Sequence, residues 1–309
     1  MGGPIVDTRM SAQLPEDVLK RRWDVVEGWI LVDRAGAVWL VKGYEHPDVG
    51  FVVQRYPHGR RGSPRGLAVS MYLDCTGREV DVLRLADVAR AVDPALALKS
   101  ERLPGQLQEL LDVLQPSWAG LTGSRALGLA SATSDYDLLI YDADASRIYR
   151  ALRDLAEDGL IGECEPDLRA SKVADTFSRR DFELLHPLKL LDSCYKGVPY
   201  TIRILASERS SPCSSRFSSL GWVEGLLEVE DASRAYLTPS RYGARLSGLG
   251  DVVLYTWRTR YQELPAGQYY VVALAQRNED ERSIYLVPDI GGVLRPAALW
   301  RRPVTARGG

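Results

Sequence analysis

Two aspartates, Asp135 and Asp137, stand one residue apart at the start of an apolar run. Alternate side chains of an extended strand point to the same side, so the two carboxylates share a face and Tyr136 points away. Two carboxylates this close repel each other unless a cation lies between them. Mg²⁺ or Mn²⁺ takes one or two carboxylates together with phosphate oxygens. The pair therefore predicts a divalent-metal site with Asp135 and Asp137 as ligands.

A glycine-serine turn precedes the first aspartate by ten residues. Gly123 lets a backbone approach phosphate groups closely, and Ser124 can donate its hydroxyl to them. Arg125 follows and could hold a triphosphate, and a surface arginine at a helix start is an equally good interpretation. Phosphoryl transfer depends on positioning and charge neutralisation more than on covalent chemistry. The combined residues predict a phosphoryl-transfer site, with Asp135 and Asp137 as its catalytic residues.

This pattern resembles the polymerase-β-like nucleotidyltransferase superfamily. The match is Gly123-Ser124, ten further residues and then Asp-Tyr-Asp-Leu from Asp135, within residues 115–160. The whole chain is also similar to uncharacterised archaeal proteins regarded as nucleotidyltransferases, through stretches such as VKGYEHP, VVQRYP and YLTPSRY. The resemblance implies Mg²⁺-dependent transfer of a nucleoside monophosphate from a nucleoside triphosphate to RNA, a protein hydroxyl or a small molecule. The alternative is a non-catalytic nucleotide or nucleic-acid binding protein on the same scaffold.

The superfamily usually has a third carboxylate on the next strand, as a metal ligand or general base. Here that strand is expected at 198–206, which contains no acid and has Arg203 at its middle. Asp181, Glu183 or Glu208 could supply the third acid, or the site has two carboxylates only. Arg203 could bind phosphate or pair with a nearby acid.

Three parts are expected along the chain: a β-rich N-terminal module over 1–105, a nucleotidyltransferase-type domain over 106–207 and a β-barrel-like module over 208–309. The fold class is α+β, a polymerase-β-like mixed sheet flanked by two small β-rich modules. Short β-branched and aromatic runs between turn residues predict the strands of both flanking modules. A serine-rich stretch at 207–219 is the clearest linker.

Helical spacing is present in three segments of the first half of the chain. They cover 80–98, 104–116 and 144–159. Asp144 or Ser146 would be the N-cap of the last one, and Gly159 its end. This helix would cover one face of the central sheet and leave the Asp-x-Asp face open.

Aromatic residues mixed with arginines occur in two places that could bind single-stranded nucleic acid. The first has Tyr56 beside an arginine-rich loop, for which a solvated basic loop is the simpler interpretation. The second is Tyr255, Trp257 and Tyr261, for which core packing competes. The arginines are Arg55, Arg60, Arg61 and Arg65 in the first, and Arg258 and Arg260 in the second.

Composition limits the compartment and the partners of the protein. Thirty-nine basic and 41 acidic side chains give a net charge of −2, so the chain has no bulk attraction to nucleic acid. The four cysteines are far apart, which predicts neither a zinc site nor a disulfide framework. No apolar stretch approaches the ~18 residues of a membrane span, and the first residues have no apolar signal region. We expect a cytoplasmic protein without a membrane partner; its oligomeric state stays open.

Overall fold

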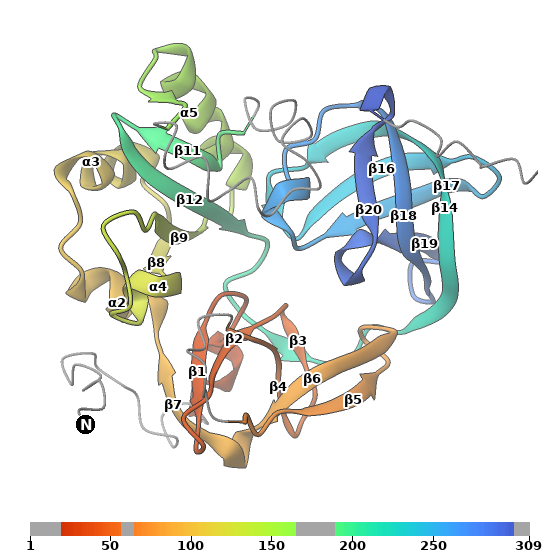
Figure 1. Ribbon diagram of the computed structural model, residues 1–309, viewed down its shortest axis with the longest axis horizontal. Helices are drawn as coiled ribbons and strands as arrows, with labels where there is room; N and C mark the ends of the chain where they lie inside the picture. Colours follow the sequence, from red (N-terminus) through yellow and green to blue (C-terminus); the bar gives the residue numbers. More distant parts are fainter. Residues whose placement is uncertain (1–19, 57–64, 165–188, 300–309) are drawn as a thin grey trace, which may run out of the picture.

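The computed structural model describes residues 20–56, 65–164 and 189–299. Within these ranges the protein is a mixed α/β structure, mostly strand (46%), with four α-helices and four sheets (Figure 1). Two proposed third acids, Asp181 and Glu183, lie outside the described residues, as do Arg60 and Arg61 of the basic loop. The short 3-10 helices are η1 (Arg22–Asp24), η2 (Leu85–Asp87), η4 (Thr259–Tyr261), η5 (Pro288–Ile290) and η6 (Ala297–Leu299).

The N-terminal part is a six-stranded antiparallel sheet. In spatial order its strands are β5 (Val69–Leu73), β6 (Arg78–Arg84), β4 (Gly50–Arg55), β2 (Val38–Val41), β1 (Ile30–Asp33) and β7 (Val88–Val92). The helix expected over 80–98 is therefore wrong for most of its length, and only α2 (Pro94–Ser100) is helical. Val80 and Val82 are buried while Glu79 and Asp81 are exposed, so the true period of this segment is two.

The central part is a second sheet with helices on one face. Its strands are β10 (Ile161–Gly162), β11 (Asp192–Tyr195), β12 (Val198–Leu205), β9 (Tyr136–Tyr141) and β8 (Trp118–Leu121), in that order, and its helices are α3 (Gly105–Leu114), α4 (Gly123–Ala126) and α5 (Ala145–Glu157). Strand β12 runs parallel to β9, and the other neighbours are antiparallel. Helix α5 confirms the predicted helix, with the Asp144 carboxylate accepting the Arg147 N–H at its start.

The two faces of the central sheet have different neighbours. One face packs on α3 and α5, where Leu138 and Ile202 join Leu110 and Leu152 in a buried cluster. From the other face Leu139 contributes to the core of the N-terminal sheet. The Asp-x-Asp side chains belong to this second face because they alternate with the buried Tyr136 and Leu138. The expectation that this face is open is therefore wrong at Leu139, where the N-terminal part packs on it.

The C-terminal part is a strongly curved sheet. Its strands are β14 (Phe217–Arg234), β16 (Ser240–Leu246), β17 (Gly250–Thr256), β19 (Ser283–Val287), β18 (Gly267–Asn278) and β20 (Val293–Pro296). The long strand β14 pairs with both β16 and β18, so the sheet closes on itself around a buried cluster that includes Leu254 and Val271 (Figure 1). A short strand, β15 (Leu237–Thr238), pairs with β12 and connects this part to the central sheet.

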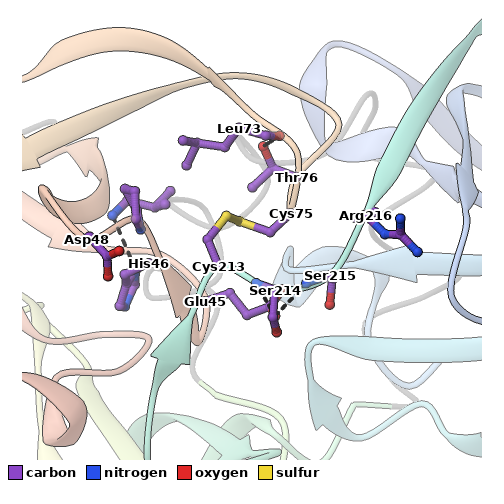
Figure 2. Close-up of a disulfide and its surroundings, with 12 residues drawn as sticks. Glu45, His46, Asp48, Leu73, Cys75, Thr76, Cys213, Ser214, Ser215 and Arg216 are labelled. Carbon is purple, nitrogen blue, oxygen red and sulfur yellow. Dashed lines mark hydrogen bonds between the residues drawn. A yellow bond between two sulfur atoms is a disulfide. The ribbon is translucent and has the colours of Figure 1, made fainter.

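The serine-rich stretch between the central and C-terminal parts is attached to the N-terminal sheet. Strand β13 (Ser211–Pro212) pairs with β3 (Glu45–His46), and Cys213 forms a disulfide with Cys75 (Figure 2). The Glu45 carboxylate accepts the backbone N–H groups of Ser214 and Ser215. The predicted linker is therefore held against the N-terminal sheet by a strand pairing, a disulfide and hydrogen bonds.

The expectation of no disulfide framework is wrong: Cys75 pairs with Cys213 and Cys164 with Cys194, which leaves no free cysteine. Spacing gave no signal because partners 138 residues apart meet only through the tertiary fold. Disulfides are typical of oxidising compartments, and intracellular proteins of hyperthermophilic archaea are an exception. No helix among the described residues has the length and apolar character needed to span a membrane.

Candidate functional site

Asp135 and Asp137 lie where β9 begins, at the edge of the sheet face that faces the N-terminal part. Both side chains are partly exposed, and Tyr136 between them is 8% exposed. The alternation predicted for the three residues is therefore confirmed. Neither carboxylate is buried in an apolar core, because both residues keep part of their surface exposed.

The glycine of the Gly-Ser turn lies directly against the second aspartate. Gly123 has a φ of +70°, and a Cβ at this position would collide with the Asp137 carboxylate. Just before it, the Thr122 N–H donates to the Asp137 carbonyl at 2.9 Å. The Ser124 hydroxyl is half-buried and makes no hydrogen bond with the described residues. The structure therefore brings Gly123, Ser124 and Asp137 together, as the spacing predicts.

Arg125 is occupied by contacts that fix the loop before β9. Its Nε donates to the Asp135 carbonyl at 3.1 Å and one terminal nitrogen donates to the Ser134 carbonyl at 2.7 Å. The guanidinium also lies 3.6 Å from the Tyr136 ring centroid and 3.6 Å from Glu101. These contacts favour a positioning role, in which Arg125 holds the backbone from which the Asp135 side chain projects.

A row of polar side chains crosses three strands at the level of Asp137. Thr201 on β12 is directly opposite Asp137, and Asp192 on β11 is directly opposite Thr201. Residues opposite each other on neighbouring strands share a face. The Thr201 hydroxyl lies 2.9 Å from an Asp135 oxygen and 3.3 Å from an Asp192 oxygen. One hydroxyl carries one proton, so it donates to only one of these carboxylates at a time.

Asp192 is thus an acid that sequence reasoning did not place at the site. Glu208, the alternative named from sequence, lies beyond the far end of β12, beside a small pocket that Arg21 and Asp93 also line. Only the strand register reveals Asp192, because it depends on how β11 and β12 pair. In the sequence, the one local feature of Asp192 is that it begins the short strand β11, and this does not show which strand β11 pairs with.

Arg203 lies at the middle of β12, the strand on which the superfamily usually has its third carboxylate. Its guanidinium lies 3.3 Å from the Glu27 carboxylate, which also accepts Lys42 Nζ at 2.9 Å. Glu27 is fully buried. Of the two roles considered for Arg203, pairing with a nearby acid is therefore confirmed.

Tyr56 approaches the Asp pair from the N-terminal sheet. Burial raises the pKa of its phenol to about 12, and the negative charges of Asp137 and Asp135 add to the rise. The side chain is only 9% exposed and belongs to the central core cluster. Burial of the ring favours a packing role for Tyr56 over stacking on a nucleic acid, and its phenol lies near enough to Asp137 and Asp135 to be affected by their charges.

The carboxylate oxygens of Asp135 and Asp137 are the kind of ligand that a hard cation prefers, but they do not surround an ion on all sides. Among the described residues, no three acid, histidine or cysteine side chains converge as a metal site. Asp135 and Asp137 nevertheless offer carboxylate oxygens on one accessible face, and Mg²⁺ usually keeps water or substrate oxygens in its remaining positions. The residues therefore fit a divalent ion that arrives with a phosphate-bearing ligand.

No protein-family model matches this chain, and comparisons with curated proteins and with solved structures find no match either. The likeness to polymerase-β-like nucleotidyltransferases therefore depends on the motif and on the geometry described above.

Proposed function

We propose that the protein is a Mg²⁺-dependent nucleotidyltransferase, which transfers a nucleoside monophosphate from a nucleoside triphosphate to an acceptor hydroxyl. The observation that carries the proposal is the direct contact between the Gly123 turn and the Asp137 carboxylate, with Asp135 on the same accessible face. The polymerase-β-like fold assignment of the central sheet belongs to this proposal, as does the cytoplasmic location.

Each residue of the site has a role that follows from its position. Asp135 and Asp137 would hold the divalent ion, which neutralises charge on the triphosphate when it is bound. The absence of a side chain at Gly123 lets phosphate oxygens come close to the backbone, and the Ser124 hydroxyl is available to donate to them. Thr201 orients the Asp135 carboxylate.

The acceptor hydroxyl must lose a proton during the transfer. Asp192 shares the Thr201 hydroxyl with Asp135 and lies on the same face, so it is the described acid best placed to complete the carboxylate set. A side chain within hydrogen-bond reach of the attacking hydroxyl can act as its base. RNA, a protein hydroxyl and a small molecule all remain acceptor classes of the proposal.

The test is label transfer from α-³²P-labelled nucleoside triphosphates in Mg²⁺ or Mn²⁺, with total RNA, the protein itself and a panel of small alcohols as acceptors. The variant with Asp135→Ala and Asp137→Ala should lose transfer by at least about 1,000-fold, because the divalent ion that neutralises the triphosphate would lose both of its proposed ligands. Asp154→Asn, an exposed change on α5, is the matched control and should retain full activity. Equal transfer by the wild type and the double variant would refute the proposal.

A second candidate function is nucleotide binding without turnover on the same residues. The observation that favours it is that no three carboxylates converge among the described residues. Asp192→Asn separates the two functions. If Asp192 takes part in transfer, this variant binds metal and nucleotide but loses label transfer; if the wild type binds nucleotide and transfers none to any acceptor, binding is the function.

A further inference from the structure

A cavity of about 700 Å³ lies where the three parts of the chain meet. Its walls come from the N-terminal sheet, from Arg203 on β12 and from the face of the C-terminal sheet that is opposite its buried cluster. None of the residues of the Gly-Ser turn or the Asp pair lines it. A volume of this size is typical of small-molecule sites, which often occur at the junction of domains.

One wall of the cavity is a continuous series of aromatic rings. Tyr44 and Trp257 have centroids 5.7 Å apart, Trp257 and Tyr255 are 5.9 Å apart, and Tyr255 and Tyr285 are 5.4 Å apart. Phe217 extends the series, 5.3 Å from Tyr285. Tyr44 is fixed by hydrogen bonds to the Thr238 carbonyl and from the Ala206 N–H. Tyr44 and Trp257 are both partly exposed, with their ring planes tilted by 42° to each other. An aromatic ring at the wall of a cavity can stack on a flat ligand ring.

The basic residues around the cavity differ in how their charge is compensated. Lys42 and Arg203 pair with Glu27, and Arg241 pairs with Glu281. These ion pairs leave little charge for a ligand.

The Arg78 guanidinium, by contrast, makes no hydrogen bond or ion pair with the described residues, and Arg78 bonds only through its backbone. Burial lowers the pKa of its guanidinium, and the nearest acid is Asp289. The Asp289 carboxylate already accepts the Thr256 hydroxyl and the Trp257 N–H, and burial raises its pKa. Glu79 and Asp81 also line the cavity, but they are exposed, where water screens their charge. Arg258 also lines the cavity and donates to the Asp289 carbonyl. Arg78 is therefore a cation inside the cavity that no ion pair with the described residues compensates.

We propose that this cavity binds a nucleoside phosphate, with the base stacked on the Trp257–Tyr44 wall and the phosphate on Arg78. Arginine forms paired hydrogen bonds with phosphate oxygens, and an aromatic face accepts any base. The site needs no divalent metal, because its cation is a side chain. It is independent of the proposed transfer reaction and could take a free mononucleotide or one unit of a single strand.

Isothermal titration calorimetry in EDTA tests the proposal, because chelation removes any metal-dependent binding at the Asp pair. AMP, GMP, CMP and UMP are the probes; adenosine lacks the charge and ribose 5-phosphate lacks the ring. We expect the mononucleotides to bind at least tenfold more tightly than either partial ligand. A six-nucleotide oligomer that binds more than tenfold tighter than AMP identifies a single strand as the source, and equal affinity identifies the free nucleotide.

Two variants remove the two halves of the site. Arg78→Gln should weaken AMP binding at least tenfold, and Trp257→Leu should do the same while leaving ribose 5-phosphate binding unchanged. Arg245→Gln, at an exposed arginine outside the cavity, and Asp137→Asn are controls that should bind AMP normally. Melting curves confirm that each variant is folded. No AMP binding at millimolar concentration, or binding that both cavity variants retain, would overturn the proposal.

Discussion

Glu27 and the Asp135–Asp137 pair both lie against the same face of the central sheet, yet their environments are opposite. Glu27 is completely buried, and its two oxygens accept Lys42, Arg203 and the Gly43 N–H. The aspartates are partly exposed, and one of them shares a single hydroxyl proton with Asp192. The Glu27 carboxylate has cationic and backbone partners within the protein, whereas the two aspartates keep part of their surface exposed to solvent.

This difference separates acids that hold the fold from acids that are available for chemistry. A buried charge must be paired and hydrogen-bonded, because desolvation is otherwise too costly. Gly28, next to Glu27, packs so closely on Leu139 that a Cβ would overlap its side chain. Asp135 and Asp137 precede Leu139 by four and two residues, at the start of β9. Substitutions in the two regions should therefore affect different properties.

The largest expected effect is the loss of stability in Glu27→Ala. Removing this carboxylate leaves Lys42 and Arg203 without a counterion, which typically costs about 3–5 kcal/mol of unfolding free energy. Chemical denaturation measures it. Glu109→Ala breaks the exposed ion pair with Lys196, which solvent screens, and should change stability far less than Glu27→Ala does. Similar losses in both variants would show that the burial of Glu27 does not matter.

A second buried group, His46, should make stability depend on pH. Burial, with a contribution from Arg22, lowers the pKa of His46 from 6.5 to about 4, despite favourable contributions from Val25 and Glu27. The unfolded chain then binds a proton between pH 6.5 and 4 that the folded protein does not. Stability should fall by up to about 3 kcal/mol as the pH drops through this range.

His46→Gln should remove this part of the pH dependence, because glutamine does not titrate. Urea unfolding of both proteins at pH 7, 5.5 and 4.5 gives the comparison. If the unfolding free energy changes equally with pH in the wild type and in His46→Gln, His46 is protonated as easily in the folded protein as in the unfolded chain.

The sequence predicts the centre of the Asp site better than its surroundings. The turn, the alternation around Tyr136 and the helix capped by Asp144 depend on neighbours within one segment, and each is found in the structure. Thr201 and Asp192 depend on the pairing of β9, β12 and β11, which spacing does not reveal. Their place beside Asp137 is a property of strand register alone.

Two predictions that the structure contradicts, the helix from Val80 and the absence of disulfides, also failed because of long-range contacts. Valines in the segment that starts at Val80 fit a helical period as well as a strand period in a short window, and pairing with β4 and β5 decides for strand. The two disulfides join cysteines that the fold brings together from 138 and 30 residues apart. Long-range contacts of this kind leave no local pattern in a single sequence.

The third prediction concerns the metal response of the open site. Mg²⁺ or Mn²⁺ should stabilise the wild type by roughly 2.7 kcal/mol at about 100 times the dissociation constant. That is a rise of a few degrees in Tm, on the order expected for a chain of this size. Nucleoside triphosphate should add to the rise only when the metal is present. Asp137→Asn should lose both responses while its Tm without metal stays unchanged or increases, because a like charge is removed.

Differential scanning calorimetry of the wild type, Asp137→Asn and the surface control Asp154→Asn measures these shifts. Asn has the shape of Asp, so the close contact with Gly123 is preserved and a loss of response reports on charge. A metal response that Asp137→Asn retains in full would place the ion elsewhere in the protein.

The smallest expected effect tests whether Thr201 positions Asp135. Thr201→Val keeps the shape of the side chain but removes the hydroxyl that lies within hydrogen-bond distance of Asp135 and Asp192. Groups that orient metal ligands commonly contribute 10- to 100-fold to affinity, and the partial exposure of Asp135 favours the lower end, about tenfold. Thr201→Ser retains the hydroxyl and should restore the affinity. Stability should change by only about 1 kcal/mol in Thr201→Val, since one hydrogen bond at a partly exposed acid is lost. Mn²⁺ titration followed by electron paramagnetic resonance measures the affinity directly. If Thr201→Val binds Mn²⁺ as tightly as the wild type, the hydroxyl supports the sheet only, and the Asp pair is held by its own strand and by Arg125.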